Sequence, residues 1–170
     1  MRAISAFNPL TVSQRSFLSA LQGEQVHYLV TGSYAGRHYG IQRQPGDLDI
    51  VVRREVSNIA QLVTALSKLP CVDPTLIRAK FLEPDKAFHW KDVEVSNGVP
   101  HVPIPDLFAE RTLVHHEEFL LPLISRHLFV QGKLYALADP QRPQNKRDQD
   151  LADLQALLNT LDAHHIVAVR

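Results

Sequence analysis

The chain has 170 residues, and its 18 Lys and Arg balance 18 Asp and Glu, so the formal net charge is zero. This length suits one domain with its own core. A content of 45% hydrophobic and 21% charged residues excludes a disordered or low-complexity chain. Neutrality argues against non-specific nucleic-acid binding, although a local basic patch would escape a whole-chain average.

Cysteine content and apolar runs bear on the compartment. The single cysteine, Cys71, excludes an internal disulfide and a multi-cysteine zinc site, and it favours a reducing compartment. No apolar run approaches the ~18–20 residues of a membrane span. The first residues, MRAISAFNPLTVSQ, hold one Arg and no sustained apolar segment, so no signal peptide is expected. We therefore expect a cytoplasmic protein with no membrane association.

The first part of the chain alternates between helical and strand patterns. Apolar spacing predicts helices and β-rich runs predict strands. The expected helices are Thr11–Gln22, Tyr34–Tyr39 and Ser57–Leu69, with Ser57 as a cap, and the expected strands are Val26–Val30 and Asp47–Val52.

The second part predicts two more strands and then helices. The strands are Ala87–Trp90 and Asp92–Val95. Asp106 is expected to cap a helix through about His115, and Phe119–Leu137 is expected to be partly helical. A last helix from about Asp148 to His164 is expected to bury Leu151, Leu154, Leu157, Leu158 and Leu161. We predict one α+β (α/β-like) domain over residues 1–170, a small mixed sheet packed with helices. Its core spans about 26–105 and its helical C-terminal segment about 106–165.

A Gly-Ser pair follows the strand that ends at Val30. Gly32 has no side chain, so a phosphate can approach its backbone closely. The N–H groups at the start of the next helix favour an anion, and Ser33 adds a hydroxyl donor. On its own the pair is a weak signal, and an ordinary strand-to-helix turn is the favoured explanation.

Two carboxylates lie close together on the next predicted strand. Asp47 and Asp49 are two residues apart, so they share one face with Cα atoms ~7 Å apart. Carboxylates this close repel each other unless a cation lies between them, and Mg²⁺ prefers oxygen ligands. For an isolated D-x-D, an edge strand that exposes its acids to water is the favoured alternative.

The order of these features is more specific than any one of them. The chain has Gly32-Ser33-Tyr34-Ala35, then Gly40, Arg43 and Gly46-Asp47-Leu48-Asp49. This series resembles the nucleotidyltransferase superfamily with the DNA-polymerase-beta-like fold. The resemblance is to its small bacterial branch of abortive-infection nucleotidyltransferase toxins and minimal nucleotidyltransferases. Pro45 stands where many relatives have Thr.

The resemblance implies a third carboxylate on a later strand, where relatives usually have Asp. Asp92 and Glu94 share a face, so strand alternation does not choose between them. We favour Glu94, which lies between Val93 and Val95.

The similarity continues downstream. Arg111 stands where relatives often have a Lys in a helix. The segment Arg147–Leu154 is similar to the family's K-D-x-x-D-L helix start, with Gln149 for Lys. A helix N-terminus also favours Asp148 and Asp150 by itself, and we weight that explanation above a catalytic role.

The resemblance implies transfer of an NMP from an NTP to a hydroxyl of RNA, protein or a small molecule. In this scheme Gly32 and Ser33 bind phosphates. Asp47 and Asp49 hold Mg²⁺ or Mn²⁺, with Glu94 or Asp92 as base or second-metal ligand. Arg43 or a nearby Lys neutralises charge.

Membership in a toxin–antitoxin or phage-defence system, with a cognate partner protein or a homodimer, is also implied. Two alternatives stay open. One is a non-catalytic nucleotide-binding regulatory module on the same fold. The other is an unrelated α/β interaction protein whose D-x-D is a surface accident.

Overall fold

The computed structural model describes residues 9–70, 72–99 and 102–167. Cys71, whose place after Leu69-Pro70 predicts a small buried residue, lies outside this range, as does the side chain of Leu161. The elements in chain order are α1 (Val12–Gly23), β1 (Tyr28–Val30), α2 (Gly32–His38), β2 (Leu48–Val52), α3 (Val56–Leu66), α4 (Pro74–Phe81), β3 (Ala87–Trp90), β4 (Val93–Ser96), α5 (Ile104–Ala109), β5 (Arg111–His116), β6 (Phe119–Ile124), α6 (Arg126–Ala138) and α7 (Gln144–Val167).

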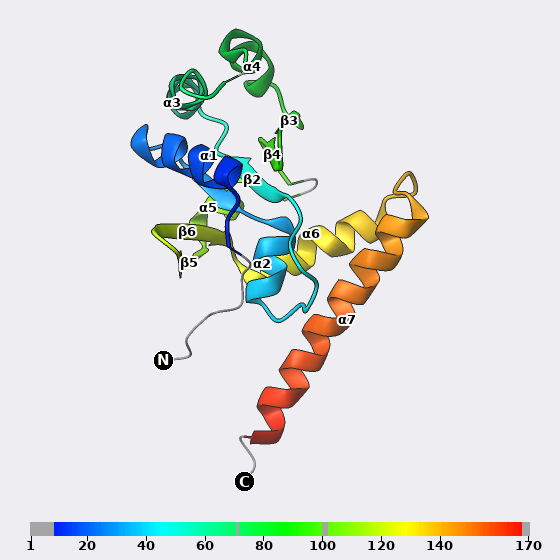
Figure 1. Ribbon diagram of the computed structural model, residues 1–170. Coiled ribbons are helices and arrows are strands. Elements are labelled where there is room, and N and C mark those ends of the chain that lie inside the picture. Colours follow the sequence, from blue (N-terminus) through cyan, green and yellow to red (C-terminus); the bar gives the residue numbers. More distant parts are fainter. Residues whose placement is uncertain (1–8, 71, 100–101, 168–170) are drawn as a thin grey trace.

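The strands form one mixed sheet (Figure 1) in the order β3-β4-β2-β1-β6-β5. β2 pairs with β4 and β1 with β6 in parallel, and the other neighbours are antiparallel. This sheet with its packed helices confirms the α+β expectation. The parallel pairing of β2 with β4 decides which later carboxylate comes level with Asp49.

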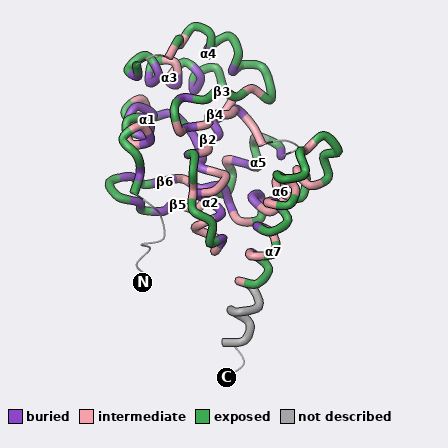
Figure 2. The backbone as a smooth tube through the Cα atoms, turned by 45° about the vertical axis from the view of Figure 1, so that its right-hand side comes forward, coloured by how far each residue is buried: buried purple, intermediate pink, exposed green. Residues whose placement is uncertain are grey.

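Helices cover both faces of the sheet. Residues of α1, α3 and α4 pack with Leu48, Ile50 and Val52 in one apolar cluster. Residues of α2, α5, α6 and α7 pack with Val51 in a second cluster. Because successive strand residues point to opposite faces, Asp49 shares the face of Val51. Buried positions concentrate on the central strands and the inner sides of these helices (Figure 2).

Local signals account well for the N-terminal elements. Thr11 caps α1 by accepting from the backbone N–H of Gln14, whose side chain accepts from Thr11 N in return. Helix α3 begins earlier than expected, because Glu55 is its N-cap residue and Ser57 lies inside the helix. Helix α4 was not anticipated, although Asp73 caps it and Pro74 stands at its first turn, both familiar start signals.

The expected helix from Asp106 to about His115 is wrong. Helix α5 ends at Ala109, and the following residues form the β5–β6 hairpin, with Glu117 in its turn at φ 53°. Alternation explains the difference, since Val114 and His116 are buried whereas their neighbours on β5 are not. Arg111 therefore begins an edge strand instead of lying in a helix. Only the α6 part of Phe119–Leu137 is helical.

The last helix forms as expected but buries different residues. Leu157 is buried and Leu154 is half-buried, whereas Leu151 and Leu158 are 56% and 61% exposed, so their predicted burial is wrong. Asp150 and Asp153 are buried in their place. The side of α7 that faces the body is therefore ionic as well as apolar.

Candidate functional site at the cavity between β2 and the α6–α7 pair

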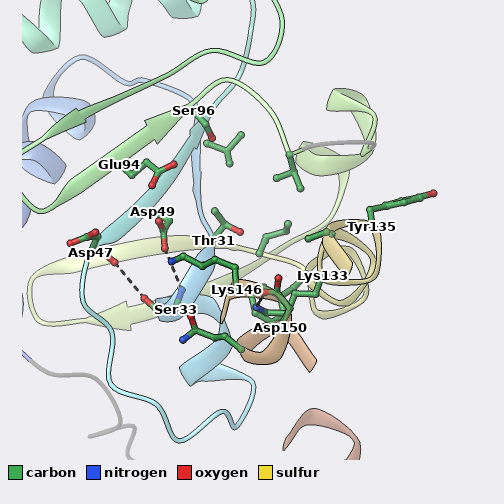
Figure 3. Close-up of a pocket in the computed structure, with 18 of the residues that line it drawn as sticks. Thr31, Ser33, Asp47, Asp49, Glu94, Ser96, Lys133, Tyr135, Lys146 and Asp150 are labelled. Carbon is green, nitrogen blue, oxygen red and sulfur yellow. Dashed lines mark hydrogen bonds and ion pairs between the residues drawn. The ribbon is translucent and has the colours of Figure 1, made fainter. Parts of the chain in front are cut away.

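A cavity of about 560 Å³ opens on the face of the sheet that carries Asp49. One wall comes from β2, β4 and the start of α2, and the opposite wall from α6 and α7 (Figure 3). The strand wall is acidic and the helix wall carries cations. Its polar lining includes Thr31, Ser33, Arg43, Asp47, Asp49, Glu94, Ser96, Lys133, Asp139, Arg142, Lys146, Gln149 and Asp150.

Two carboxylates of the acidic wall are direct neighbours in the sheet. Asp49 on β2 is the register partner of Glu94 on β4, and Asp47 lies just before β2. Burial and the nearby Glu94 charge raise the pKa of Asp49 to about 6, while the N–H of Ser33 opposes this shift. His89 of β3 pairs across from Glu94, with Nε2 3.8 Å from Oε2. The wall therefore holds negative charge that its own residues compensate only in part.

Gly32 is required by the position of the Asp49 carboxylate. Gly32 has φ +56°, and a Cβ built there would lie 1.7 Å from Asp49 Oδ2. The Ser33 N–H donates to the same oxygen at 3.4 Å, and Thr31 N donates to the Asp49 carbonyl at 2.9 Å. The Gly-Ser turn and the second Asp of D-x-D are thus in direct contact, which explains why both occur in this sequence.

The two candidates for the third carboxylate lie in different surroundings. Glu94 lines the cavity beside Asp47 and Asp49, and Asp92 does not. The Asp92 Oδ2 accepts instead from the Thr11 hydroxyl at 2.6 Å, at the start of α1. The structure therefore brings Glu94, and not Asp92, to the Asp47–Asp49 pair.

Arg43 lines the cavity but its guanidinium is held by α7. Its Nη2 lies 3.1 Å from Asp153 Oδ2. With the Gln149 amide oriented to satisfy both groups, its oxygen accepts from Arg43 Nε at 2.8 Å and Nη1 at 3.1 Å. Gln149, which stands where the resembling family has Lys, therefore orients Arg43.

A buried ionic cluster joins α6 to α7, and sequence reasoning missed its role. Asp150 and Asp153 each have side chains only 5% exposed. Lys133 Nζ lies 2.8 Å from Asp150 Oδ1 and 2.7 Å from Asp153 Oδ2, and Arg142 Nη2 lies 2.6 Å from Asp150 Oδ2.

The similarity of Arg147–Leu154 to the family's helix start was the available signal for this cluster. The helix-start explanation that we preferred is wrong, because α7 begins at Gln144 with no acidic residue in its first turn. The residues around Lys133 form no sequence pattern that predicts its place in this cluster.

The acidic wall fits a divalent cation in charge and donor chemistry. Its oxygen donors are those that Mg²⁺ prefers, and burial together with the nearby Glu94 charge raises the pKa of Asp49. As the side chains stand, no group of three or more His, Cys, Asp or Glu residues converges on a metal position within the described ranges. His115 and His116 are adjacent on β5, so their side chains point to opposite faces and do not converge on one metal position.

Comparisons with known proteins add no family to this picture. No family model matches the chain, and no curated protein matches it. Among the helices in the described part of the chain, none is both long and apolar enough to cross a membrane.

Proposed function

We propose that this chain is a nucleotidyltransferase that moves an NMP from an NTP to a hydroxyl acceptor. The observation that supports it best is one cavity in which Asp47, Asp49 and Glu94 oppose a cationic wall across the Gly32-Ser33 turn. A nucleoside triphosphate with a divalent cation matches both walls, because the cation suits the carboxylates and the phosphates suit the basic groups.

A divalent ion, Mg²⁺ or Mn²⁺, is part of this proposal. Asp47, Asp49 and Glu94 would hold it, since they are the carboxylates on the β2–β4 wall of the cavity, whereas Asp139 and Asp150 line its α6–α7 side. Such an ion supplies charge neutralisation at the phosphates and polarisation of the phosphoryl group undergoing transfer. Asp92 lies outside this set, because Thr11 already engages its carboxylate.

The chain's own residues supply the proton transfer and the positioning. Glu94 accepts the proton of the acceptor hydroxyl, whose oxygen bonds to the α-phosphorus. The bond from that phosphorus to the oxygen bridging to the β-phosphate breaks, and pyrophosphate leaves. Ser33 and Arg43 orient the phosphates from the turn and from the α7 side. Arg43 can do this rigidly because Gln149 and Asp153 hold it.

The acceptor classes that the resemblance implies are RNA, a protein hydroxyl and a small molecule. A place in a toxin–antitoxin or phage-defence system, with a cognate partner protein or as a homodimer, stays a prediction from the resemblance. Radiolabelled NTPs presented with each acceptor class would identify both the nucleotide and the acceptor.

The test of the reaction is Asp49→Ala against Asp92→Asn in a label-transfer assay with Mg²⁺. We expect Asp49→Ala to abolish transfer while circular dichroism shows a retained fold. Asp92→Asn should keep most of the transfer, because its carboxylate contacts Thr11 outside the cavity. Transfer that persists in Asp49→Ala would sink the assignment.

A second candidate is a non-catalytic nucleotide-binding module on the same fold. It is favoured by the contact between Asp49 and the Ser33 N–H, which occupies a donor that a phosphate would use. Pro45 and Glu94, where relatives have Thr and Asp, also favour it. Calorimetric NTP binding with Mg²⁺, without label transfer to any acceptor, would support this alternative.

A further inference from the structure

Gln14 of α1 is a deeply buried polar side chain, only 1% exposed. A buried amide needs hydrogen-bond partners for both its oxygen and its nitrogen. Gln14 Oε1 accepts from Thr11 N at 3.1 Å and from the Tyr34 hydroxyl at 2.9 Å. Its Nε2 donates to Gly46 O and to Asp92 O, at 3.4 Å each. The amide is therefore fully used, and three of its four bonds lead away from α1.

The chemistry of these partners fixes the orientation of the amide. Gly46 O and Asp92 O are backbone carbonyls, which only accept, so the NH₂ group must face them. Thr11 N only donates, so it requires the amide oxygen. A side chain of similar length without the amide would take a donor from both carbonyls and an acceptor from the buried Tyr34 hydroxyl.

The bond to Gly46 bears on the backbone of Asp47. Asp47 lies in a bend just before β2, which begins at Leu48, so it lies outside the strand ladder. Its own carbonyl accepts from the Ser33 hydroxyl at 3.4 Å (Figure 3). Gln14 holds the peptide group before it, through Gly46 O. Asp47 is therefore held from two sides, by the turn at the cavity and by α1 behind it.

The bond to Asp92 extends this contact to β4. Asp92 O accepts from Gln14 Nε2 and, at 2.9 Å, from Leu48 N at the start of β2. The Asp92 carboxylate is fixed in turn by the Thr11 hydroxyl at 2.6 Å. Glu94 follows two residues later on the same strand. One buried amide thus joins the starts of the two strands that form the acidic wall.

We propose that Gln14 is a positioning residue of the acidic wall, which holds Asp47 in place beside the other two carboxylates. Gln14 lies outside the cavity lining, so it acts through the backbone of Gly46 and Asp92 and contacts no ligand. The inference rests on the proposed function for the role of the cation. Groups behind metal ligands set the geometry of those ligands, and their loss typically weakens metal binding roughly 10–100-fold.

The first measurement needs no ligand and follows hydrogen exchange at the Leu48 amide, relative to the amides of α6. Gln14→Met removes the amide at similar side-chain length, so Leu48 should exchange about tenfold faster, as loss of a hydrogen bond at this strand start predicts. Asn58→Leu is the matched control. Asn58 is 2% exposed, and its amide bonds to His27 and Arg53, away from the cavity. This variant should leave the relative exchange at Leu48 unchanged.

The second measurement is the Mn²⁺ affinity of the full chain, from the electron paramagnetic resonance signal of the free ion. Gln14→Met should weaken binding about tenfold, at the lower end of the range because Gln14 acts through the backbone. Asn58→Leu should bind as the unsubstituted chain does. Gln14→Glu carries the same comparison if Gln14→Met fails to fold, because it keeps the acceptor oxygen and loses both donors. Its added negative charge alone would tighten Mn²⁺ binding, so weaker binding must come from displacement of the Asp47 segment.

The outcomes separate this inference from the proposed function. If Leu48 exchange and Mn²⁺ affinity changed equally in the Gln14 and Asn58 variants, or in neither, Gln14 would have no positioning role. If the unsubstituted chain bound no Mn²⁺, the metal-dependent transferase would be refuted, and Leu48 exchange alone would decide whether Gln14 holds this segment. Gln14-dependent Mn²⁺ binding without nucleotidyl transfer to any acceptor would leave the inference standing and refute the transferase.

Discussion

The contact between Gly32 and Asp49 leads to a sharp prediction for Gly32→Ala. A Cβ at residue 32 would lie 1.7 Å from Asp49 Oδ2 and 2.4 Å from its Cγ. The backbone there has φ +56°, a region that costs an L-residue with a side chain about 1–2 kcal/mol. The Asp49 carboxylate must therefore move away from the turn, and the turn is strained as well.

The magnitude follows from these two terms. Strain contributes about 1–2 kcal/mol, and loss of the hydrogen bond from Ser33 N to the Asp49 carboxylate contributes roughly 1–2 kcal/mol more. We expect Gly32→Ala to lower the free energy of unfolding by about 3 kcal/mol. For a chain of this size that corresponds to a fall in Tm of roughly 6–12 °C.

Thermal unfolding followed by circular dichroism measures this effect, and label transfer measures its consequence at the site. Gly46→Ala is the control, because a Cβ at Gly46 meets nothing within 4 Å and its φ lies outside the left-handed region. We expect the Tm of Gly46→Ala to be close to that of the unsubstituted chain. If Gly32→Ala matched Gly46→Ala in both Tm and transfer, the close approach of Asp49 to the turn would be refuted.

Three further predictions concern charge. Burial and Glu94 raise the pKa of Asp49 from 3.8 to about 6, so the folded state binds the extra proton and stability should fall as pH rises from about 4 to 6. Asp49→Asn should flatten that dependence and raise the free energy of unfolding at pH 7 by about 1–2 kcal/mol, after allowance for the partial exposure of the side chain. If urea unfolding gave the same pH dependence for Asp49→Asn and the unsubstituted chain, this prediction would be contradicted. Mg²⁺ should raise the Tm of the unsubstituted chain more than that of Asp49→Asn, and equal shifts would argue against a cation on this wall. Lys133→Met leaves Asp150 and Asp153 buried with one cation fewer, so it should lower the free energy of unfolding by about 3–5 kcal/mol. Lys86→Met removes an exposed pair with Glu83 and should lower it by under about 1 kcal/mol.

Local chemistry alone was sufficient to predict several features of this protein. The start of α1 follows from Thr11 and Gln14. The two-residue spacing predicted Asp47 and Asp49 on one side of the chain, and both line the cavity although Asp47 lies just before β2. The order of the Gly-Ser turn and D-x-D predicted that they serve one site, and they do line one cavity. These features depend on residues close in sequence, so their geometry needs no knowledge of distant partners.

Tertiary structure decided the remaining features, because each depends on a distant partner. Residues 111–124 became the β5–β6 hairpin because β6 finds β1 beside it in the sheet. The choice between Asp92 and Glu94 needed the pairing of β4 with β2 and the approach of Thr11 from α1. From the sequence alone, Asp150 has the position of a helix-end residue. Only the fold brings Lys133 of α6 and Arg142 of the following turn into ion pairs with it. Sequence determined which groups are present, and long-range packing determined which of them are buried and which are paired with an opposite charge.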